Sequence, residues 1–409
     1  MVTVVLLGTL DTKADEYGYV RDRLVDLGCE VLMVDAGVLA EPGLPPDIDR
    51  TSVARAGGVD ITSLAADGDR GAAVAAMADG AAEVLCRLWR ERRLDAVLAL
   101  GGSGGTSIGT RAMRALPTGV PKVMVSTMAS GNTRPYVGAS DVTMMYPIVD
   151  IAGINPISAR ILDNAAAAAA GMARAPRTVV TDDRPMIGTS MVGLTMPCVN
   201  ALRERLESHG YTVLTFHATG AGGEALEALA EEGHLVAVAD VTPTELADDL
   251  AGGTCSAGPN RLTAAGRRGI PQVVSLGALD MVNFGPPDMI PERYRGRLCH
   301  AHNPTITLMR TSPAECAELG RRIAAKLNAA TGPVALFVPA GGLSAISAPG
   351  GPFHDEQADR ALVDSLLTGL RPEVAVRRVD AGAADPGLGE AMADTLHQMC
   401  LSNAREQRA

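Results

Sequence analysis

The stretch that decides the fold of this chain is Val97-Leu-Ala-Leu-Gly-Gly-Ser-Gly-Gly-Thr-Ser-Ile-Gly109. A short apolar run is followed by glycines with a serine and a threonine among them, and a helical pattern comes next. This order is typical of a buried strand that ends in a glycine-rich turn before a helix. Such a turn leaves backbone N–H groups open, and with the positive end of the helix dipole they favour an anion. The stretch therefore predicts a parallel sheet with a phosphate or nucleotide site at its edge.

Strand and helix patterns alternate on both sides of this stretch, as they do in parallel α/β sheets. We interpret the segment Leu39–Thr62, rich in proline, glycine and charge, as an excursion over the surface. The expected strands of the first half are Val2–Leu7, Glu30–Val34, Ala96–Leu100 and Lys122–Ser126, and the expected helices are Glu16–Leu27, Asp69–Arg92 and Ser158–Met172.

The second half of the chain repeats motifs of the first half in the same order. Leu206–Leu214 resembles Leu24–Leu32, and Gly269–Leu276 resembles Gly119–Ser126. All strand–helix units have similar local sequence patterns, so unrelated units also resemble one another. This is the alternative to a duplication. We predict an α/β fold of two similar Rossmann-like lobes with mostly parallel sheets, spanning residues 1–175 and 186–403 and joined by Ala173–Pro185. The carboxyl ends of both sheets are expected to face an interdomain cleft that takes a small-molecule substrate.

Composition excludes several classes of protein. The chain has 409 residues, 47% of them hydrophobic and 3% aromatic, with a net charge of −11. This acidic balance argues against a nucleic-acid or anionic-membrane binder, since both need a basic surface. The seven cysteines are scattered, without a Cys-x-x-Cys pair, which predicts reduced thiols. No secretory signal or bilayer-length apolar run is visible, so we expect a cytoplasmic protein with no membrane partner.

The glycine stretch itself supplies the first predicted cofactor-binding residues. It is neither a Gly-x-Gly-x-x-Gly fingerprint nor a phosphate-binding loop ending in Gly-Lys-Ser/Thr. The structural alternative is a tight turn that needs glycine for positive φ. The stretch has more glycines and hydroxyls than one turn requires, which favours phosphate binding. The residues in question are Gly101, Gly102, Ser103, Gly104, Gly105 and Thr106.

Polar residues after the other strands extend this predicted site. Lys13 could neutralise a phosphate, and Asp11 could reach a metal ion or a ribose hydroxyl. Capping of the following helix is the alternative role for Asp11. Asp141 and Asp150 are either magnesium ligands or caps. The remaining predicted cofactor-binding residues are Gly8, Thr9, Asp35 as a ribose contact, and the Thr127, Ala129, Ser130, Gly131 and Asn132 loop.

The second half concentrates groups suited to acid–base chemistry. A histidine has a pKa near neutral pH, which suits a general acid or base. His300 and His302 would share one face of an extended segment, as a zinc site needs, but no third ligand follows from the spacing. Caps and satisfied hydrogen bonds are the alternative roles. The predicted catalytic residues are His217, Glu224, Asp280, His302 and His354.

Several ordered motifs resemble one family. They are Gly8–Lys13, Gly101–Thr106, Ser126–Gly131, His217–Glu224 and Gly351–Asp355. The family contains the ATP-binding amino-terminal region of the tomato mosaic virus resistance protein and many uncharacterised bacterial proteins. The resemblance covers nearly the whole chain and implies two α/β subdomains, ATP with magnesium in the first half, and a homodimer. The plant proteins carry a further barrel domain, whose activity is not expected here.

These observations leave three functional hypotheses. The first is an ATP-dependent enzyme, similar to a kinase or ligase, that acts on a small molecule. The second is a nucleotide-binding module that regulates partner binding without turnover. The third is a metal-dependent hydrolase or lyase centred on His300 and His302.

Overall fold

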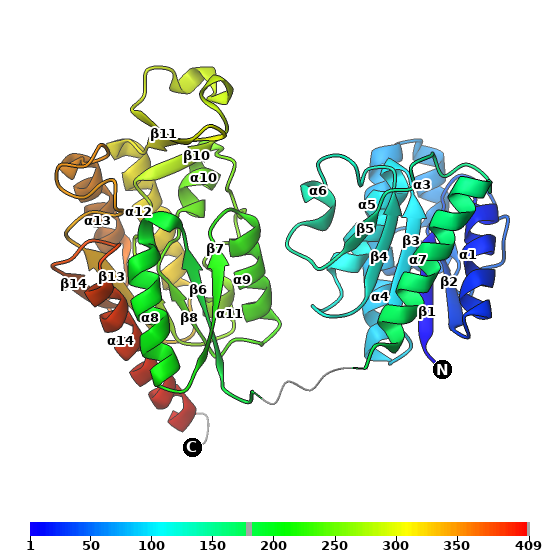
Figure 1. The fold of residues 1–409 in the computed structure, drawn as a ribbon, viewed down its shortest axis with the longest axis horizontal. Helices are drawn as coiled ribbons and strands as arrows, with labels where there is room; N and C mark the ends of the chain where they lie inside the picture. The colour runs from blue at the N-terminus through cyan, green and yellow to red at the C-terminus, as the bar shows by residue number, and fades with distance from the viewer. Residues whose placement is uncertain (177–181, 407–409) are drawn as a thin grey trace. The chain divides into compact units, whose positions relative to one another are not determined.

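A computed structural model describes residues 1–176 and 182–406 of the chain (Figure 1). The chain divides into two compact units, Met1–Val180 and Thr181–Ala409, and each is described by itself. The predicted join Ala173–Pro185 includes residues 177–181, which lie outside the described residues. None of the helices in the described ranges has the length and hydrophobicity needed to cross a bilayer. All seven cysteines are free, as predicted.

Unit 1 is built around a five-stranded parallel sheet with the order β2-β1-β3-β4-β5. The central strands β1, β3 and β4 are almost fully buried, as expected for a sheet covered on both faces, whereas the edge strands β2 and β5 are only partly buried. The predicted strands are confirmed to within a residue or two, and the edge strand β5 was not predicted. The strands are β1 Thr3–Gly8, β2 Glu30–Asp35, β3 Ala96–Gly101, β4 Lys122–Ser126 and β5 Thr143–Met145.

Successive residues of β1 face opposite layers of helices. Val4 and Leu6 pack in the core under α1 and α7, and Val5 and Leu7 pack in the core under α2, α4 and α5 (Figure 1). The helices of unit 1 are α1 Ala14–Asp26, α2 Arg50–Ala56, α3 Ile61–Asp67, α4 Arg70–Arg90, α5 Ser103–Arg114, α6 Arg134–Val137 and α7 Pro156–Arg174.

Two predictions for unit 1 need correction. The segment Leu39–Thr62 is not irregular throughout, because it contains α2 and the start of α3. Asp49 and Asp60 cap these two helices by accepting the amides of Ser52 (2.7 Å) and Thr62 (2.7 Å). The glycine stretch is not a loop either, because helix α5 begins within it at Ser103.

Unit 2 repeats the strand order of unit 1. Its six-stranded parallel sheet has the order β7-β6-β8-β9-β13-β14. As in unit 1, the second strand of the unit forms the edge of the sheet and pairs with the first. The shared order supports the duplication that the repeated motifs predict. The strands are β6 Met186–Met191, β7 Thr212–His217, β8 Ala237–Asp240, β9 Gln272–Val274, β13 Val334–Pro339 and β14 Ala375–Val379.

Helices α8 and α14 pack on one face of this sheet, and the core on the other face includes residues of α10, α12 and α13. A three-stranded antiparallel sheet, β10-β12-β11, was not predicted. Its strands are β10 Met281–Phe284, β11 Cys299–Asn303 and β12 Ile306–Arg310. The helices of unit 2 are α8 Met196–Ser208, α9 Ala221–Glu231, α10 Glu245–Ala251, α11 Ala264–Arg267, α12 Pro313–Asn328, α13 Glu356–Gly369 and α14 Pro386–Glu406.

Candidate functional site

A pocket of about 650 Å³ lies at the carboxyl edge of the unit 1 sheet. The order β2-β1-β3 places the switch point between β1 and β3, where ligands of doubly wound folds bind. The connections that follow β1, β2 and β3 all line the pocket, together with the start of α4. The lining residues are Thr9, Asp11, Thr12, Lys13, Ala36, Val38, Leu39, Leu64, Gly68, Asp69, Arg70, Ala73, Val74, Gly101, Gly102, Ser103, Gly104, Gly105, Ile108 and Asp150.

The amino terminus of α5 opens into this pocket. Strand β3 ends at Gly101, Gly102 is the N-cap, and no side chain caps the helix. The first intrahelical bond recorded is from the Thr106 amide to the Gly102 carbonyl, 2.8 Å. Among the described residues, the amides of Ser103, Gly104 and Gly105 therefore have no acceptor. These three donors, with the helix dipole behind them, form a site for an anion.

The glycines at this turn are not there for positive φ. Gly101, Gly102, Gly104 and Gly105 are absent from the positive-φ residues of the described chain. Gly101 is needed for packing, because a Cβ there would lie 2.9 Å from the Gly105 Cα. For Gly102 and Gly104 the nearest atoms to a Cβ would be 3.9 and 3.7 Å away. The fold does not require glycine at these two positions, and the missing side chains leave the amides open to the pocket.

Unit 2 contains an internal comparison for this arrangement. Helix α9 also starts in a glycine-rich turn, and there the carboxylate of Glu245 accepts the amides of Gly220 (2.7 Å) and Gly223 (3.0 Å). Glu245 is fully buried, and a Cβ on Gly223 would lie 2.0 Å from it. The chain thus supplies its own anion to the start of α9, whereas the start of α5 faces a pocket.

Asp11 and Lys13 flank the anion site from the connection after β1. Asp11 Oδ2 accepts the amides of Val38 (3.0 Å) and Leu39 (2.8 Å), which fixes the connection after β2. Asp11 Oδ1 is buried without a partner among the described residues. The Lys13 ammonium donates to the Ile151 carbonyl. Asp11 and Lys13 therefore line the pocket, and both also hold neighbouring segments in place.

Three predicted cofactor-binding residues lie beneath the pocket instead of in it. A Cβ on Gly8 would lie 1.9 Å from the ring of Tyr17, so Gly8 is there for packing. Asp35 is fully buried and accepts the amides of Leu10 (3.1 Å) and Gly37 (2.8 Å), so it does not reach a ribose. Burial also raises the pKa of the Asp35 carboxyl. Thr106 is buried, and its hydroxyl donates to the Gly102 carbonyl (2.7 Å).

The predicted loop after β4 lies next to the pocket but does not line it. Thr127 Oγ1 would be 3.9 Å from a Cβ on Gly102, and the Thr127 amide donates to the Gly101 carbonyl (3.4 Å). The rest of the loop forms turns that bond to themselves, such as Gly131 N to Met128 O at 3.2 Å. Ala129, Ser130, Gly131 and Asn132 are not among the lining residues.

The sequence did not indicate the role of Tyr17, which joins the strands β1 and β3. The Tyr17 hydroxyl is buried between β1 and β3, where it donates to the Leu7 carbonyl (2.6 Å) and accepts the Leu100 amide (2.9 Å). Burial raises the pKa of this hydroxyl. The sequence predicted a helix from Asp69 but did not place its start at the pocket. Arg70 lines the pocket, and Asp69 caps α4 by accepting the Gly71 amide (2.8 Å).

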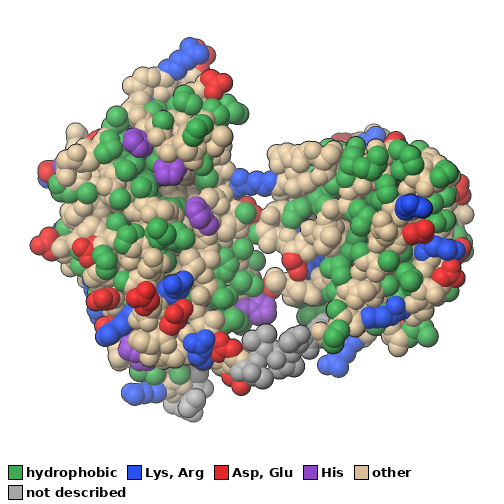
Figure 2. Space-filling model, viewed as in Figure 1, with side chains coloured by type: hydrophobic (Ala, Val, Ile, Leu, Met, Phe, Trp, Pro, Cys, Tyr) green, Lys and Arg blue, Asp and Glu red, His purple; other side chains and the backbone are tan. Residues whose placement is uncertain are grey.

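The unit 2 candidates fall into two places. His217 and Glu224 flank the connection between β7 and α9, where His217 is exposed. The others lie around the antiparallel sheet: His302 is exposed on β11, and His354 is exposed just before α13, 3.8 Å from Glu356. Figure 2 shows histidines distributed over the surface of unit 2. Among the described residues no group of three ligands could hold a metal ion, which leaves the zinc hypothesis without support.

Asp280 differs from the other four because it is fully buried. It accepts a hydrogen bond from the Ser344 hydroxyl (2.8 Å), and burial raises its pKa to about 6. The Asp280 carboxyl is therefore enclosed by the fold, and its catalytic role stays a prediction. The Arg310 guanidinium donates to the backbone carbonyls of Asp280 (3.4 Å) and Phe353 (2.9 Å).

A buried ionic cluster occupies the carboxyl edge of the unit 2 sheet, in the place that the pocket has in unit 1. Arg261 is fully buried and pairs with Asp240, with Glu245 (2.5 Å) and with Glu227 (3.3 Å). The Ser190 hydroxyl donates to Asp240 (2.6 Å). The partners of Arg261 are thus carboxylates of the chain itself.

The fold defines a two-domain α/β protein whose halves share one strand order. In the first half, the uncapped amino terminus of α5 faces a pocket. The chain belongs to the uncharacterised protein family UPF0261. The model of the family's N-terminal domain matches residues 2–178, and the model of its C-terminal domain matches residues 184–400.

Relatives of the chain occur in bacteria and in a plant. A UPF0261 protein of Clostridium tetani is 47% identical over 97% of this chain and 98% of its own length. The ToMV resistance protein Tm-1(GCR237) of Solanum lycopersicum is 44% identical over 73% of this chain and 40% of its own length. Among solved structures, a UDP-GlcNAc 2-epimerase of Methanocaldococcus jannaschii matches 67% of this chain and 83% of its own at 12% identity, with a TM-score of 0.25.

Proposed function

We propose that the unit 1 pocket binds a nucleoside triphosphate, ATP in the first instance, as its magnesium complex. The observation that carries the proposal is the uncapped start of α5, whose amides at Ser103, Gly104 and Gly105 open into a pocket of about 650 Å³. A volume of this size is within the range of small-molecule and cofactor sites.

These amides would donate hydrogen bonds to phosphate oxygens. Backbone donors at a helix start need no side chain, so glycine at Gly102 and Gly104 allows the closest approach. Lys13 also lines the pocket and adds a positive charge to it. The Glu245 carboxylate at the start of α9 demonstrates, within this chain, how an oxyanion sits on such a turn.

Aliphatic side chains of the pocket suit the body of a nucleotide. They come from three elements, with Val38 after β2, Val74 in α4 and Ile108 in α5 among them. Such side chains would contact the faces of a base by dispersion and by exclusion of water. The pocket therefore offers both backbone donors for phosphates and apolar contacts for a base.

The acidic residues of the pocket fit a magnesium ion. Asp11, Asp69 and Asp150 line the pocket, where they would repel a phosphate, and Mg²⁺ bound to the phosphates would reduce that repulsion. Asp11 Oδ1, buried without a partner among the described residues, is an available oxygen ligand. Mg²⁺ commonly binds one or two carboxylates, with substrate phosphates and water completing the shell. Asp11 and Asp150 would hold the ion, which would neutralise charge on the phosphates.

Of the roles left open by the sequence, nucleotide binding is the one to which the site lends support. The reaction, the small-molecule substrate and the homodimer stay predictions. A binding titration of the purified protein with ATP, with and without Mg²⁺, tests the proposal, and analysis of the same samples for ADP tests turnover. We expect saturable binding that weakens when EDTA is added. No binding in either condition would contradict the proposal.

A further inference from the structure

Ile148 has a backbone conformation that a β-branched residue rarely adopts. Its φ is +66°, in the left-handed region, and its side chain is 63% exposed. A β-branched side chain in this region is strained, and such strain persists only where the surroundings impose it. Nothing in the packing of an exposed side chain explains the conformation, so its cause lies in the neighbouring residues.

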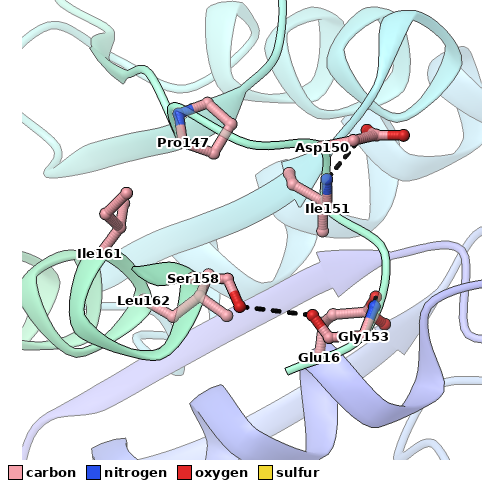
Figure 3. A pocket seen from close by; sticks show the side chains of 8 residues that line it. All are labelled: Glu16, Pro147, Asp150, Ile151, Gly153, Ser158, Ile161 and Leu162. Atoms are coloured by element: carbon pink, nitrogen blue, oxygen red, sulfur yellow. Dashed lines mark hydrogen bonds between the residues drawn. The ribbon is translucent and has the colours of Figure 1, made fainter. Parts of the chain in front are cut away.

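The residues after Ile148 are fixed at three points (Figure 3). The Ile151 side chain is buried in the core between the sheet and helices α1 and α7. The Lys13 ammonium bonds to the Ile151 carbonyl, and Glu16 accepts the Gly153 amide at 2.6 Å. These contacts connect the segment to α1, whose start lines the nucleotide pocket.

In this conformation of the segment, the carboxylate of Asp150 lies at the pocket. Asp150 lies between the strained Ile148 and the anchored Ile151, and it lines the pocket of about 650 Å³. Figure 3 shows its side chain directed away from Ser158 and Leu162. Its Oδ1 accepts the Ile151 amide at 2.8 Å, which orients the group and leaves the second oxygen for a ligand.

We infer that residues 147–153, the Asp150 segment, regulate nucleotide binding by a strain-limited conformational change. The inference rests on the proposed function and deepens it. The strained conformation brings Asp150 to the magnesium–phosphate complex, and the bound ligand stabilises that conformation. Without the ligand the strained conformation is still accessible, as in this structure, but the strain at Ile148 lowers its population. The fraction of protein in the strained conformation then limits the apparent affinity.

Two substitutions at one position test this in opposite directions. Ile148→Gly permits positive φ without strain, whereas Ile148→Pro fixes φ near −65° and forbids it. We expect the Kd for MgATP to fall about fivefold in Ile148→Gly and to rise at least about tenfold in Ile148→Pro. Ile154→Gly is the matched control, since Ile154 is also exposed but lacks positive φ. Its Kd should stay within about twofold of wild type.

Circular dichroism and thermal unfolding of each variant establish that it is folded. Hydrogen exchange adds a readout that does not depend on substitution: in the wild type, MgATP should slow exchange of the amides of residues 147–153. The order Gly, wild type, Pro from tightest to weakest supports the inference, and any other order overturns it while leaving nucleotide binding intact. Absence of binding to wild type overturns the proposed function itself.

Discussion

The ring of Tyr17 occupies the space in which a side chain on Gly8 would have to lie. A Cβ built on Gly8 would be 1.9 Å from the Tyr17 Cζ. The hydroxyl of the same tyrosine bonds to the Leu7 carbonyl and to the Leu100 amide, one on β1 and one on β3. This contact holds together the carboxyl ends of the two strands whose connections form the pocket.

Substitution of Gly8 should therefore lower stability. Gly8→Ala forces the Tyr17 ring or the backbone to move, and overpacking of this kind costs about 1–3 kcal/mol. Gly131→Ala is the control, because the nearest atom to a Cβ there is 3.8 Å away. Urea unfolding curves of both variants measure the effect. Equal midpoints for Gly8→Ala and wild type would show that Tyr17 adjusts without cost.

Substitution of Gly104 or Gly102 should abolish nucleotide binding and leave the fold intact. Both positions have room for a side chain, and Gly104→Val or Gly102→Val would place methyl groups over the open amides of α5. Gly171→Val makes the same change in α7, at a position with nothing within 4 Å, and should bind normally. Calorimetric titration with MgATP measures all three. Wild-type affinity in both pocket variants would show that Gly102 and Gly104 are not needed for nucleotide binding.

The buried cluster of unit 2 should depend strongly on its one cation. Arg261→Met leaves Asp240 and Glu245 buried without a counter-ion, and breaking such a pair costs about 3–5 kcal/mol. Arg267→Met removes a half-exposed pair with Glu231 and should cost less than about 1 kcal/mol. Thermal unfolding compares the two variants. A similar loss of stability in both variants would show that Arg261 is not essential to the buried cluster.

Asp280 should make stability depend on pH. Its pKa rises from 3.8 in the unfolded chain to about 6 in the folded one because the carboxyl is buried. Between these values the folded state holds more protons, so stability falls by about 2 kcal/mol as pH rises from 4 to 6 and levels off above about pH 7. Asp280→Asn cannot ionise and lacks this loss. The stability of Asp280→Asn relative to wild type should increase over the same range, and a constant difference would contradict the assignment.

The architecture was predictable because strand and helix patterns are local. The connections after β1 and β3 meet at one pocket, as expected, because carboxyl ends of neighbouring parallel strands share an edge. The start of α5 at Ser103 was not predicted, since glycine is a poor helix former and its frequency indicated a loop.

The roles of single polar residues were less predictable because distant neighbours decide them. Asp11 and Asp35 both follow strands, yet Asp11 lines the pocket and Asp35 is buried against the amides of Leu10 and Gly37. Asp280 likewise follows a strand in the sequence pattern but is enclosed beside Ser344. Residue type and spacing do not contain this information, because it comes from packing between segments far apart in the chain.

The central claim is that the amides at the start of α5 bind a phosphate, and a crystal structure of the protein with MgATP tests it most directly. The account predicts phosphate oxygens within about 2.7–3.2 Å of the amide nitrogens of Ser103, Gly104 and Gly105. A nucleotide bound elsewhere, with these amides facing only solvent, would contradict it.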